Sequence, residues 1–516
     1  MILGNPHTPQ VVSGGRATLD DVFRRGVSQR PDAVALADPP NRKAFTDGAP
    51  LRLTYAEVNH FVSAVAARLH RLDLPVDSVI ALQLPSTVET VITLLGVLRA
   101  GMIPALLPLL WRRSDAINAL SRVDAKVIIT ASRVGATDYG HVAMHVAAEI
   151  FPVRFVCGFG AKLADGVVPL DDIFTDQKVD PLPPVRREVN PAAHVALITW
   201  ETTPEGLVPI ARNHMELIAG GLAMLLEGQL QQQAVLLGAC TMSSFGGLAL
   251  TVLPWLLTGG TLSLHQPFDP AVLTMQCRHD RCDTVVVPGP LVSRLAEAGV
   301  FSSDNLRAVL GFWRSPERLP VSPPWQHPKA GLVDVVVFGE TALFGARRGA
   351  NGRAAAIPFG PVVAPRGAAG AVAVAELLRT EAGTIALRGP MVPRYPFPPG
   401  AERGTAPYFR ADPSGLVDTG YTCRVDRDNR SMVVTGPPPG IVSVGGYRFL
   451  LSELQDLVGR VDAGAALAAL PDTLAGHRLA GNAVDRATLR KALAAAGANP
   501  LVVDAFRDRR GAPEAA

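Results

Sequence analysis

The stretch CTMSSFGGLALTVLPWLLTGGTLSLHQPFDP, from Cys240 to Pro270, says the most about the fold. Its apolar run from Leu248 to Leu264 is interrupted by proline, glycine and threonine, so it falls short of the uninterrupted span of about 20 residues that a membrane helix needs. We interpret this run as buried core. The Phe268-Asp269-Pro270 end predicts the start of a helix that leads into the apolar strand Thr284 to Val287.

Strands and helices alternate along much of the chain on both sides of this stretch. Thr54 to Glu57 has capping-box spacing and opens an amphipathic helix, and Ser86 to Glu89 repeats that spacing before a helix that ends at Gly101. Short apolar runs between helical segments predict strands at Val79 to Leu84, Val127 to Thr130, Phe155 to Gly158, Val195 to Thr199 and Val333 to Phe338. The alternation predicts an α/β protein with mostly parallel sheets covered by helices.

The pattern changes in the last third of the chain. From about Pro358, short strands such as Gly383 to Arg388 alternate with glycine and proline turns, which predicts a smaller β-rich subdomain. At Gly436-Pro437-Pro438-Pro439-Gly440 three prolines fix φ and remove backbone donors, so neither a helix nor a central strand can continue. We place the domain boundary here, with a large N-terminal domain over residues 1–436 and a small, shortened α+β domain over 437–516.

Composition narrows the classes of function. A chain of 516 residues is too long for one hydrophobic core. Its formal charge of +3 is spread out, which does not indicate a nucleic-acid partner. The first residues, MILGNPHTPQ, lack a basic region followed by an apolar run, so we expect a cytoplasmic protein without a secretory signal. Its five cysteines are expected to be reduced thiols.

One segment, CRHDRC, holds Cys277, His279 and Cys282, whose side chains can all bind zinc. The alternative is that they are ordinary residues at the end of a helix. No second pair of ligands follows at a suitable distance, so we prefer the alternative and expect no structural metal.

Several segments, taken in order, resemble the acyl-adenylate-forming superfamily of acyl-CoA synthetases, luciferases and peptide-synthetase adenylation domains. The resemblance covers nearly the whole chain and implies the two-domain fold of those enzymes. It rests on Leu98 to Gly101 with Ile103-Pro104, Cys240 to Pro270, Gly383 to Pro390, Gly415 to Gly420, and Val444 to Leu454.

The resemblance also implies a reaction in which a carboxylate attacks the α-phosphate of ATP and a thiol then captures the acyl-adenylate. Such chemistry needs donors for the phosphates, a magnesium-binding acid and a positioned lysine. The cofactors would be ATP and magnesium, and the thiol would come from CoA or an acyl carrier protein.

The family's phosphate loop corresponds to residues 199–208, TWETTPEGLV, after a strand that ends at Ile198. The loop keeps the hydroxyls of three threonines. Glu201 and Pro204 replace the family's glycines and Leu207 replaces its lysine, so a negative charge and a proline stand where donors are needed. The segment is either still a phosphate cradle or, as we prefer, a turn between a strand and a helix that should repel ATP. The threonines that would still contact a nucleotide are Thr199, Thr202 and Thr203.

A second nucleotide segment runs from Val337 to Ala342 and resembles the family's aromatic-Gly-x-Thr-Glu. Phe338 would pack on adenine, and Gly339 and Thr341 also fit. The magnesium position is Ala342, so Glu340, two residues earlier, is either a substitute metal ligand or a solvated residue of the turn.

The remaining nucleotide contacts also depart from the family pattern. The ribose-binding acid is replaced by Tyr421, which cannot offer the same bidentate acceptor, and Asp418 lies nearby on the preceding strand. The hinge lacks its arginine and is stiffened by prolines, which puts the swing of the small domain in doubt. The C-terminal catalytic lysine is missing, because Lys491 sits in a helix and is expected to face solvent.

The resemblance places an acyl pocket beside the strand Val335 to Phe338, walled by Ser243, Phe245, Gly246 and Gly247. The first hypothesis is a catalytically degenerate member that still binds a hydrophobic or aromatic carboxylic acid, or a protein partner. The second is a working ATP-dependent carboxylate:CoA or carrier-protein ligase with a divergent nucleotide site. The third is acyl transfer from a pre-activated thioester, for which Cys240 and Cys423 lack a recognisable histidine partner.

Overall fold

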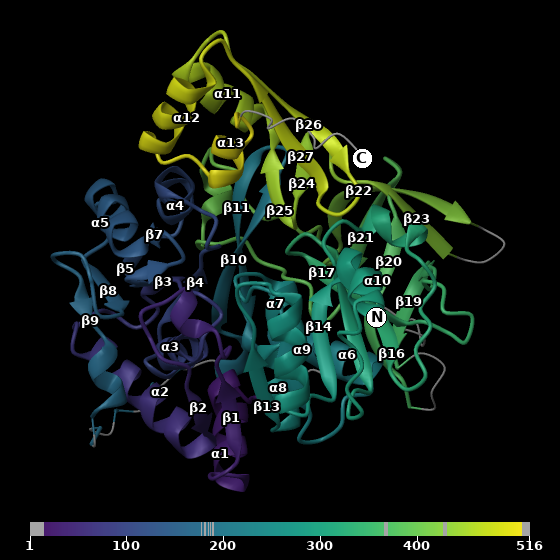
Figure 1. Cartoon of the computed structure of the whole chain (residues 1–516), viewed down its shortest axis with the longest axis horizontal. Helices are drawn as coiled ribbons and strands as arrows, with labels where there is room; N and C mark the ends of the chain where they lie inside the picture. The colour runs from purple at the N-terminus through teal and green to yellow at the C-terminus, as the bar shows by residue number, and fades with distance from the viewer. Residues whose placement is uncertain are drawn as a thin grey trace, which may run out of the picture.

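The structure is a computed structural model that describes residues 15–507, apart from residues 177, 180, 181, 184, 186, 188, 189, 366–369 and 427–430. The opening residues MILGNPHTPQ, on which the expected absence of a secretory signal rests, lie outside this part. The described chain forms two large sheets, a smaller antiparallel sheet and a C-terminal four-stranded sheet (Figure 1). No helix among the described residues is long and apolar enough to cross a membrane.

The first large sheet has seven strands and is parallel except at one edge. The pair β10–β11 is antiparallel, and every other neighbouring pair is parallel. The central strand β3 is buried along its whole length, as expected for a parallel strand covered on both faces. The strand order is β11 (Gly206–Asn213), β10 (Val195–Thr203), β4 (Ile103–Leu106), β3 (Val79–Gln83), β5 (Ala125–Ala131), β8 (Phe155–Phe159) and β9 (Val168–Pro169).

The second large sheet has eight strands, with antiparallel pairs only at its two edges, β16–β17 and β1–β2. The strand order is β17 (Ala342–Arg347), β16 (Gly331–Phe338), β15 (Ala308–Trp313), β14 (Thr284–Pro288), β12 (Val235–Gly238), β13 (Thr261–Leu264), β1 (Val34–Ala37) and β2 (Arg52–Thr54). A two-stranded ribbon, β6 (Arg133–Val134) with β7 (Thr137–Asp138), lies apart from both sheets.

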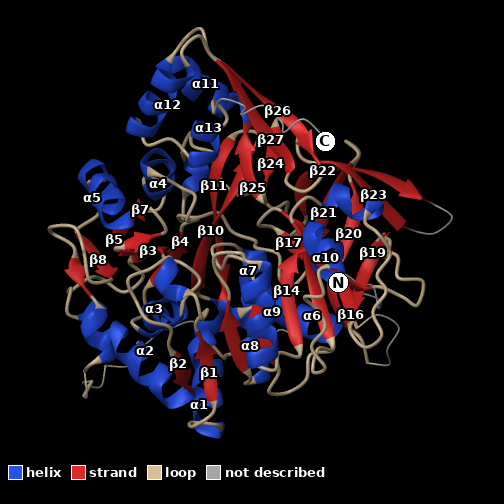
Figure 2. Ribbon diagram, viewed as in Figure 1, coloured by secondary structure: helices blue, strands red, loops and turns tan. Residues whose placement is uncertain are grey.

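Helices cover both faces of each large sheet (Figure 2). Alternate residues of one strand join different clusters, because successive side chains point to opposite faces: Val127 and Ile129 enter the largest core, and Ile128 enters the second. The largest core contains α1 (Leu19–Gln29), α2 (Tyr55–His70), α3 (Val88–Arg99), α6 (His214–Gly228), α7 (Phe245–Leu250) and α8 (Val252–Thr258). The outer faces carry α4 (Arg113–Leu120) and α5 (Tyr139–Glu149) on one sheet, and α9 (Pro270–His279) and α10 (Val292–Glu297) on the other.

The C-terminal third is built from antiparallel sheets. The six-stranded sheet has the order β18 (Ile357–Pro358), β23 (Ser431–Gly436), β22 (Val417–Asp426), β21 (Thr384–Arg388), β20 (Val372–Arg379) and β19 (Gly360–Ala364). The four-stranded sheet has the order β25 (Tyr447–Leu450), β24 (Ile441–Val444), β27 (Gly476–Asn482) and β26 (Ala466–Asp472). It packs in its own core with α11 (Leu451–Val461), α12 (Arg486–Ala495) and α13 (Pro500–Asp504), above β10 and β11 in Figure 1.

These sheets confirm the predicted α/β fold class. They also confirm the capping box at Thr54, whose side chain accepts from the Glu57 N–H while Glu57 bonds back to the Thr54 N–H. The helix expected after Phe268-Asp269-Pro270 is α9, capped by Asp269. The boundary proposed at Gly436 to Gly440 falls between β23 and β24 and stays a prediction.

The second capping box, expected from Ser86 to Glu89, is wrong. Helix α3 begins at Val88, and its N-cap Thr87 makes no side-chain capping bond. The Glu89 carboxylate instead pairs with the buried guanidinium of Arg42, and Asp38 accepts the Val88 N–H at 2.9 Å. A carboxylate gains more from a buried guanidinium, which also carries the opposite charge, than from a backbone N–H, so Arg42 takes the glutamate.

Candidate functional site

The segment expected to be a phosphate loop is a β-hairpin. Strand β10 was expected to end at Ile198 but continues to Thr203, and the chain turns through Pro204 and Glu205 into β11, with Thr203 paired to Gly206. The interpretation of this segment as a turn between a strand and a helix is therefore wrong. The pairing of β10 with β11 supplies backbone hydrogen bonds that the local sequence did not reveal.

The hairpin has two faces with different surroundings. Glu201 and Thr199 share a face with Arg212, because alternate residues of paired strands point the same way. Leu207 points to the other face, where it packs in the same apolar cluster as Trp200. The position of the family's lysine is therefore part of the core and does not face Glu201.

Glu201 is held by groups from two distant parts of the chain. One carboxylate oxygen accepts a hydrogen bond from the backbone N–H of Glu340, and the other pairs with Nη1 of Arg448. Gly339 adopts a positive φ of 58°, and a Cβ there would collide with the Glu201 carboxylate, so glycine alone fits. The Glu201 and Arg448 side chains are only 11% and 9% exposed, so this is a buried ion pair.

Glu340 also points inward. Its Oε2 accepts the Phe245 N–H at 2.7 Å, and its Oε1 lies 3.6 Å from Nη2 of Arg314. Burial raises the pKa of the Glu340 carboxyl above its ordinary value, although Arg314 opposes that rise. The alternative that Glu340 is a solvated residue of the turn is therefore wrong, because its carboxylate is buried against the Phe245 N–H and Arg314. Its role as a substitute metal ligand stays a prediction.

Three arginines complete this charged cluster, and the sequence reasoning singled out none of them. Arg212 is fully buried, donates through Nη2 to the Thr341 carbonyl at 2.8 Å, and stacks 3.9 Å from the centre of the Phe245 ring. Within the described chain, its Nε and Nη1 have no hydrogen-bond partner, and burial lowers its pKa to about 10. The sequence did offer a signal for Arg212, because an arginine stands there among the apolar residues of β11.

The other two arginines are Arg314, after β15, and Arg448 on β25. The Arg448 guanidinium lies 5.5 Å from the centre of the Tyr421 ring. Burial opposes its charge, but neighbouring acidic groups, first of all Glu201, outweigh this and raise its pKa. Arg448 belongs to the segment Val444 to Leu454 that was recognised as the start of the small domain, but its pairing across the chain had no local signal.

The predicted nucleotide residues form two groups: some are buried around Tyr421 and Arg448, and others bond within their own turn or sheet. Phe338 is buried edge-on against Tyr421, with ring centres 5.7 Å apart, and Thr202 donates to the Arg448 carbonyl at 3.3 Å. Thr199 and Thr341 are buried near them, and Thr203 bonds to the Gly206 carbonyl within its own turn. Asp418 is exposed on β22 and bonds to Thr384 and to the Gly420 N–H within its own sheet.

The predicted acyl-pocket residues are tightly packed. Ser243 lines a cavity of about 20 Å³, which is large enough for little more than one water molecule. A Cβ on Gly246 would lie 2.7 Å from the Phe312 ring, and Phe245 is fully buried under Arg212. Gly247 lies against the Thr241 carbonyl. Phe312 therefore fills the space beside Gly246.

The cysteines and the C-terminal lysine lack the features expected of catalytic residues, although Cys240 is buried within range of the Arg314 charge. Burial raises the pKa of the Cys240 thiol to about 12 and also raises that of Cys423, so neither is poised as a thiolate. His279 is exposed and pairs with Asp280, and no group of metal-binding side chains occurs within the described residues. Lys491 is exposed on α12.

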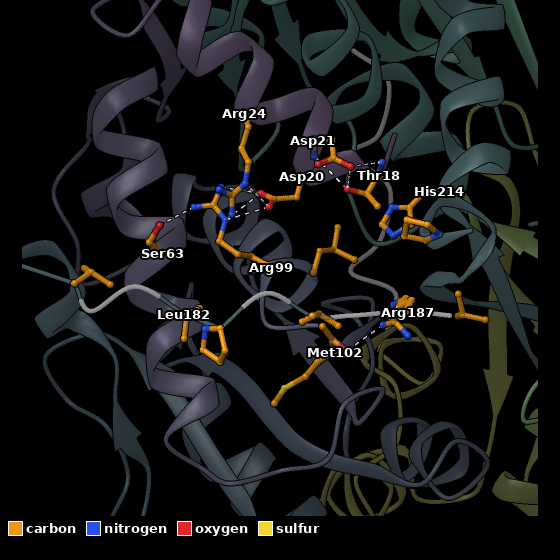
Figure 3. Close-up of a pocket in the computed structure, with 17 residues that line it drawn as sticks. Thr18, Asp20, Asp21, Arg24, Ser63, Arg99, Met102, Leu182, Arg187 and His214 are labelled. Atoms are coloured by element: carbon orange, nitrogen blue, oxygen red, sulfur yellow. Dashed lines mark hydrogen bonds and ion pairs between the residues drawn. The ribbon is translucent and has the colours of Figure 1, made fainter. Parts of the chain in front are cut away.

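A larger cavity, of about 640 Å³, lies at the other end of the β10–β11 hairpin (Figure 3). His214, at the start of α6, lines it, and burial lowers its pKa to about 4. The arginines of this cavity are already paired, Arg24 and Arg99 with Asp20, and Arg187 with Asp77. The cavity is separate from the charged cluster.

Glu216, in the first turn of α6, gives a testable pH dependence. Burial raises its pKa from 4.5 to about 7, so between these values the folded state binds more protons than the unfolded state. Stability then falls as pH rises through this window. Glu216→Gln keeps a capping side chain without the charge, and we expect it to stabilise the protein by about 3 kcal/mol at pH 8 and hardly at all at pH 4.5.

Urea unfolding of the wild type and of Glu216→Gln at both pH values measures this difference. The matched control is Glu57→Gln, in the exposed capping box of α2, which should show no such pH-dependent gain. An equal gain at both pH values would contradict the assignment to Glu216.

Comparisons with known proteins point to one family. The family model described as AMP-binding enzyme matches residues 23–339. A 2-hydroxy-7-methoxy-5-methyl-1-naphthoate–CoA ligase from Streptomyces carzinostaticus is 25% identical over 501 residues, covering 89% of this chain and 85% of that protein. The amide bond synthetase McbA from Marinactinospora thermotolerans has a similar structure, with a TM-score of 0.69 at 18% identity, covering 94% of each chain.

A stronger local match is a bassianolide nonribosomal cyclodepsipeptide synthetase from Beauveria bassiana, 37% identical over 105 residues. That match covers 19% of this chain and only 3% of the much longer synthetase. The solved structure supports the fold alone, whereas the family model spans more than half of the chain. The chain therefore belongs to the AMP-binding enzyme family of adenylate-forming, ligase-like proteins.

Proposed function

We propose that this chain is an acyl-CoA synthetase-like protein that has lost adenylation and retains its scaffold to bind a hydrophobic or aromatic carboxylic acid or a protein partner. The observation that carries the proposal is the Glu201 carboxylate, which takes the Glu340 N–H and the Arg448 guanidinium for itself. Both are donors of the kind that a phosphate group would need.

The residues present do not suit ATP with magnesium. A phosphate about 4 Å from the Glu201 carboxylate would meet a repulsion of about 4 kcal/mol at an effective dielectric near 20. Ala342 has no side-chain oxygen for a metal, and Glu340 faces the Arg314 guanidinium and accepts the Phe245 N–H. A cation there would have to compete with the Arg314 guanidinium, so these residues do not support an adenylation step.

The same scaffold supports acid binding. Arg212 and Arg314 are cationic groups beside the apolar wall formed by Phe245 and Phe312, which suits a ligand with an aromatic body and a carboxylate. Entry of an acid requires the Phe312 ring to move, because that ring fills the space next to Gly246. CoA, or the thiol of an acyl carrier protein, is a partner in this proposal only if the protein is active.

The second candidate is a working ATP-dependent carboxylate:CoA or carrier-protein ligase. It is favoured by the near full-length relative, whose name describes a naphthoate–CoA ligase. Acyl transfer from a pre-activated thioester is supported less, because the thiols of Cys240 and Cys423 are buried and their pKa values are raised. A cytoplasmic location remains part of the proposal.

Calorimetric titration with ATP and magnesium distinguishes the two candidate functions. It can be done without knowing which acid the protein binds. We expect no heat of binding up to low-millimolar ATP from protein shown by circular dichroism to be folded. Micromolar to low-millimolar binding would overturn the proposal in favour of the ligase, and release of pyrophosphate with a panel of aromatic acids would then identify the substrate.

A further inference from the structure

The contact between Glu201 and Arg448 joins residues that are 247 positions apart. Glu201 lies near the tip of the β10–β11 hairpin of the first large sheet, and Arg448 lies on β25 of the C-terminal sheet, which packs against β10. The pair therefore connects residues 437–507, named here the C-terminal unit, to the body of the protein.

Among the described residues, the other hydrogen bonds named here between the C-terminal unit and the body involve at most one charged group, and Glu453 is attracted to Arg122 at longer range. Ser114 donates to the Gly497 carbonyl at 2.8 Å, and Thr202 donates to the Arg448 carbonyl at 3.3 Å. Arg318 reaches the Asp472 carbonyl at 3.2 Å. A neutral hydrogen bond contributes modestly in water, whereas an arginine left unpaired in a buried site is strongly unfavourable. The docked position thus depends most on the pair Glu201–Arg448.

Glu201 and Arg448 each need the other as countercharge, because the groups around them do not replace either partner. Arg448 is flanked by the Tyr421 ring, with Glu317 and Glu340 as the further acids that favour its charge. Glu340 is already engaged by Arg314 and the Phe245 N–H, so it is not free to replace Glu201. Glu201 in turn has the Glu340 N–H as its second donor.

We propose that Glu201 acts as a built-in anionic ligand that fills the oxyanion site formed by the Arg448 guanidinium and the Glu340 N–H, and so locks the C-terminal unit onto the β10–β11 hairpin. The lock is an autoinhibitory contact: a phosphate-bearing or other oxyanionic ligand reaches these donors only by displacing Glu201. It fixes one docked position of the C-terminal unit, beyond the rigidity that the Gly436 to Gly440 prolines provide.

Distances between two spin labels measure the docking directly. The native cysteines are buried, so nitroxides on Ala148→Cys in α5 and Ala487→Cys in α12, both exposed positions, report the separation of the body and the C-terminal unit. With Glu201 intact we expect pulsed electron paramagnetic resonance to give one narrow distribution of the distance between the two nitroxides. In Glu201→Gln the fraction of molecules outside that distribution should rise at least tenfold.

Glu205→Gln, in the exposed turn of the same hairpin, is the matched control and should keep the narrow distribution. Arg448→Met removes the lock from the other side and should broaden the distribution as Glu201→Gln does, and it decides the matter if Glu201→Gln does not fold. A narrow distribution in folded Glu201→Gln or Arg448→Met would overturn the lock, as would equal broadening in Glu205→Gln. No nucleotide enters this experiment, so its result is independent of the ATP titration.

Discussion

Arg348→Met is expected to lower the free energy of unfolding by about 4 kcal/mol, because it leaves the fully buried Asp334 carboxylate without its countercharge. Arg348 binds Asp334 through Nε at 2.7 Å and through Nη2 at 3.0 Å. It also donates to the Pro323 carbonyl at 2.7 Å, which ties the segment after β15 to the edge of the sheet. Guanidinium-induced unfolding followed by tryptophan fluorescence measures the loss.

The pair Arg348–Asp334 also supports the candidate site. Asp334 accepts the Trp313 indole N–H at 2.9 Å, and Trp313 is flanked in sequence by Phe312 and Arg314, which reach the acyl and charged regions. Loss of Arg348 would therefore disturb the end of β15, which carries Phe312 and is followed directly by Arg314.

Arg388→Met is the control, because its pair with Glu376 is 42% and 29% exposed and should contribute less than about 1 kcal/mol. The double variant Arg348→Met with Asp334→Leu removes both buried charges and should recover much of the loss. Equal unfolding midpoints for Arg348→Met and Arg388→Met would contradict the role given to the buried pair.

The parts of the fold that could be predicted from sequence are those written in local patterns. The strands β3, β5, β8, β14 and β16 could be recognised because each is a short apolar run bounded by turn residues. Strands that are covered on both faces need such continuous apolar runs. The capping box at Thr54 is a contact between residues three apart, and in the part of the chain that the structure describes Glu57 bonds back to Thr54.

The parts that could not be predicted depend on partners distant in sequence. Ser86 and Glu89 have capping-box spacing, but Arg42, 47 residues away from Glu89, takes the carboxylate. The end of β10 contains threonine and glutamate and is followed by Pro204, so it resembles a loop, but pairing with β11 keeps the chain extended to Thr203. Glu201 was singled out from the sequence as an obstacle to phosphate, which stays a prediction, while its partner Arg448 lies on a strand of another sheet and had no local signal.

The charged cluster and the acyl region share one wall. Phe245 supplies its N–H to Glu340 and its ring to Arg212, and the next residue, Gly246, meets Phe312. A change that opens the acyl side should therefore expose the cationic groups without altering the hairpin that carries Glu201.

Phe312→Ala is expected to cost about 3 to 5 kcal/mol of stability and to create an acid-binding cavity next to Gly246. The lost ring would leave a space bounded by Gly246 and Val337, and the nearby donors include Nε and Nη1 of Arg212, which have no hydrogen-bond partner among the described residues. An aromatic acid such as 2-naphthoate can refill that space, and a ligand at 100 times its Kd restores about 2.7 kcal/mol. Thermal unfolding with and without 2-naphthoate measures both effects.

Phe301→Ala is the matched control, because Phe301 is as deeply buried but packs against Trp325 in the core on the other face of the second large sheet. It should lose comparable stability, and 2-naphthoate should not restore it. In the wild type the Phe312 ring competes with the acid, so we expect binding at least tenfold weaker than in Phe312→Ala. Equal rescue of both variants, or equal affinity in the wild type and Phe312→Ala, would place the acid elsewhere and remove the acyl pocket from beside Gly246.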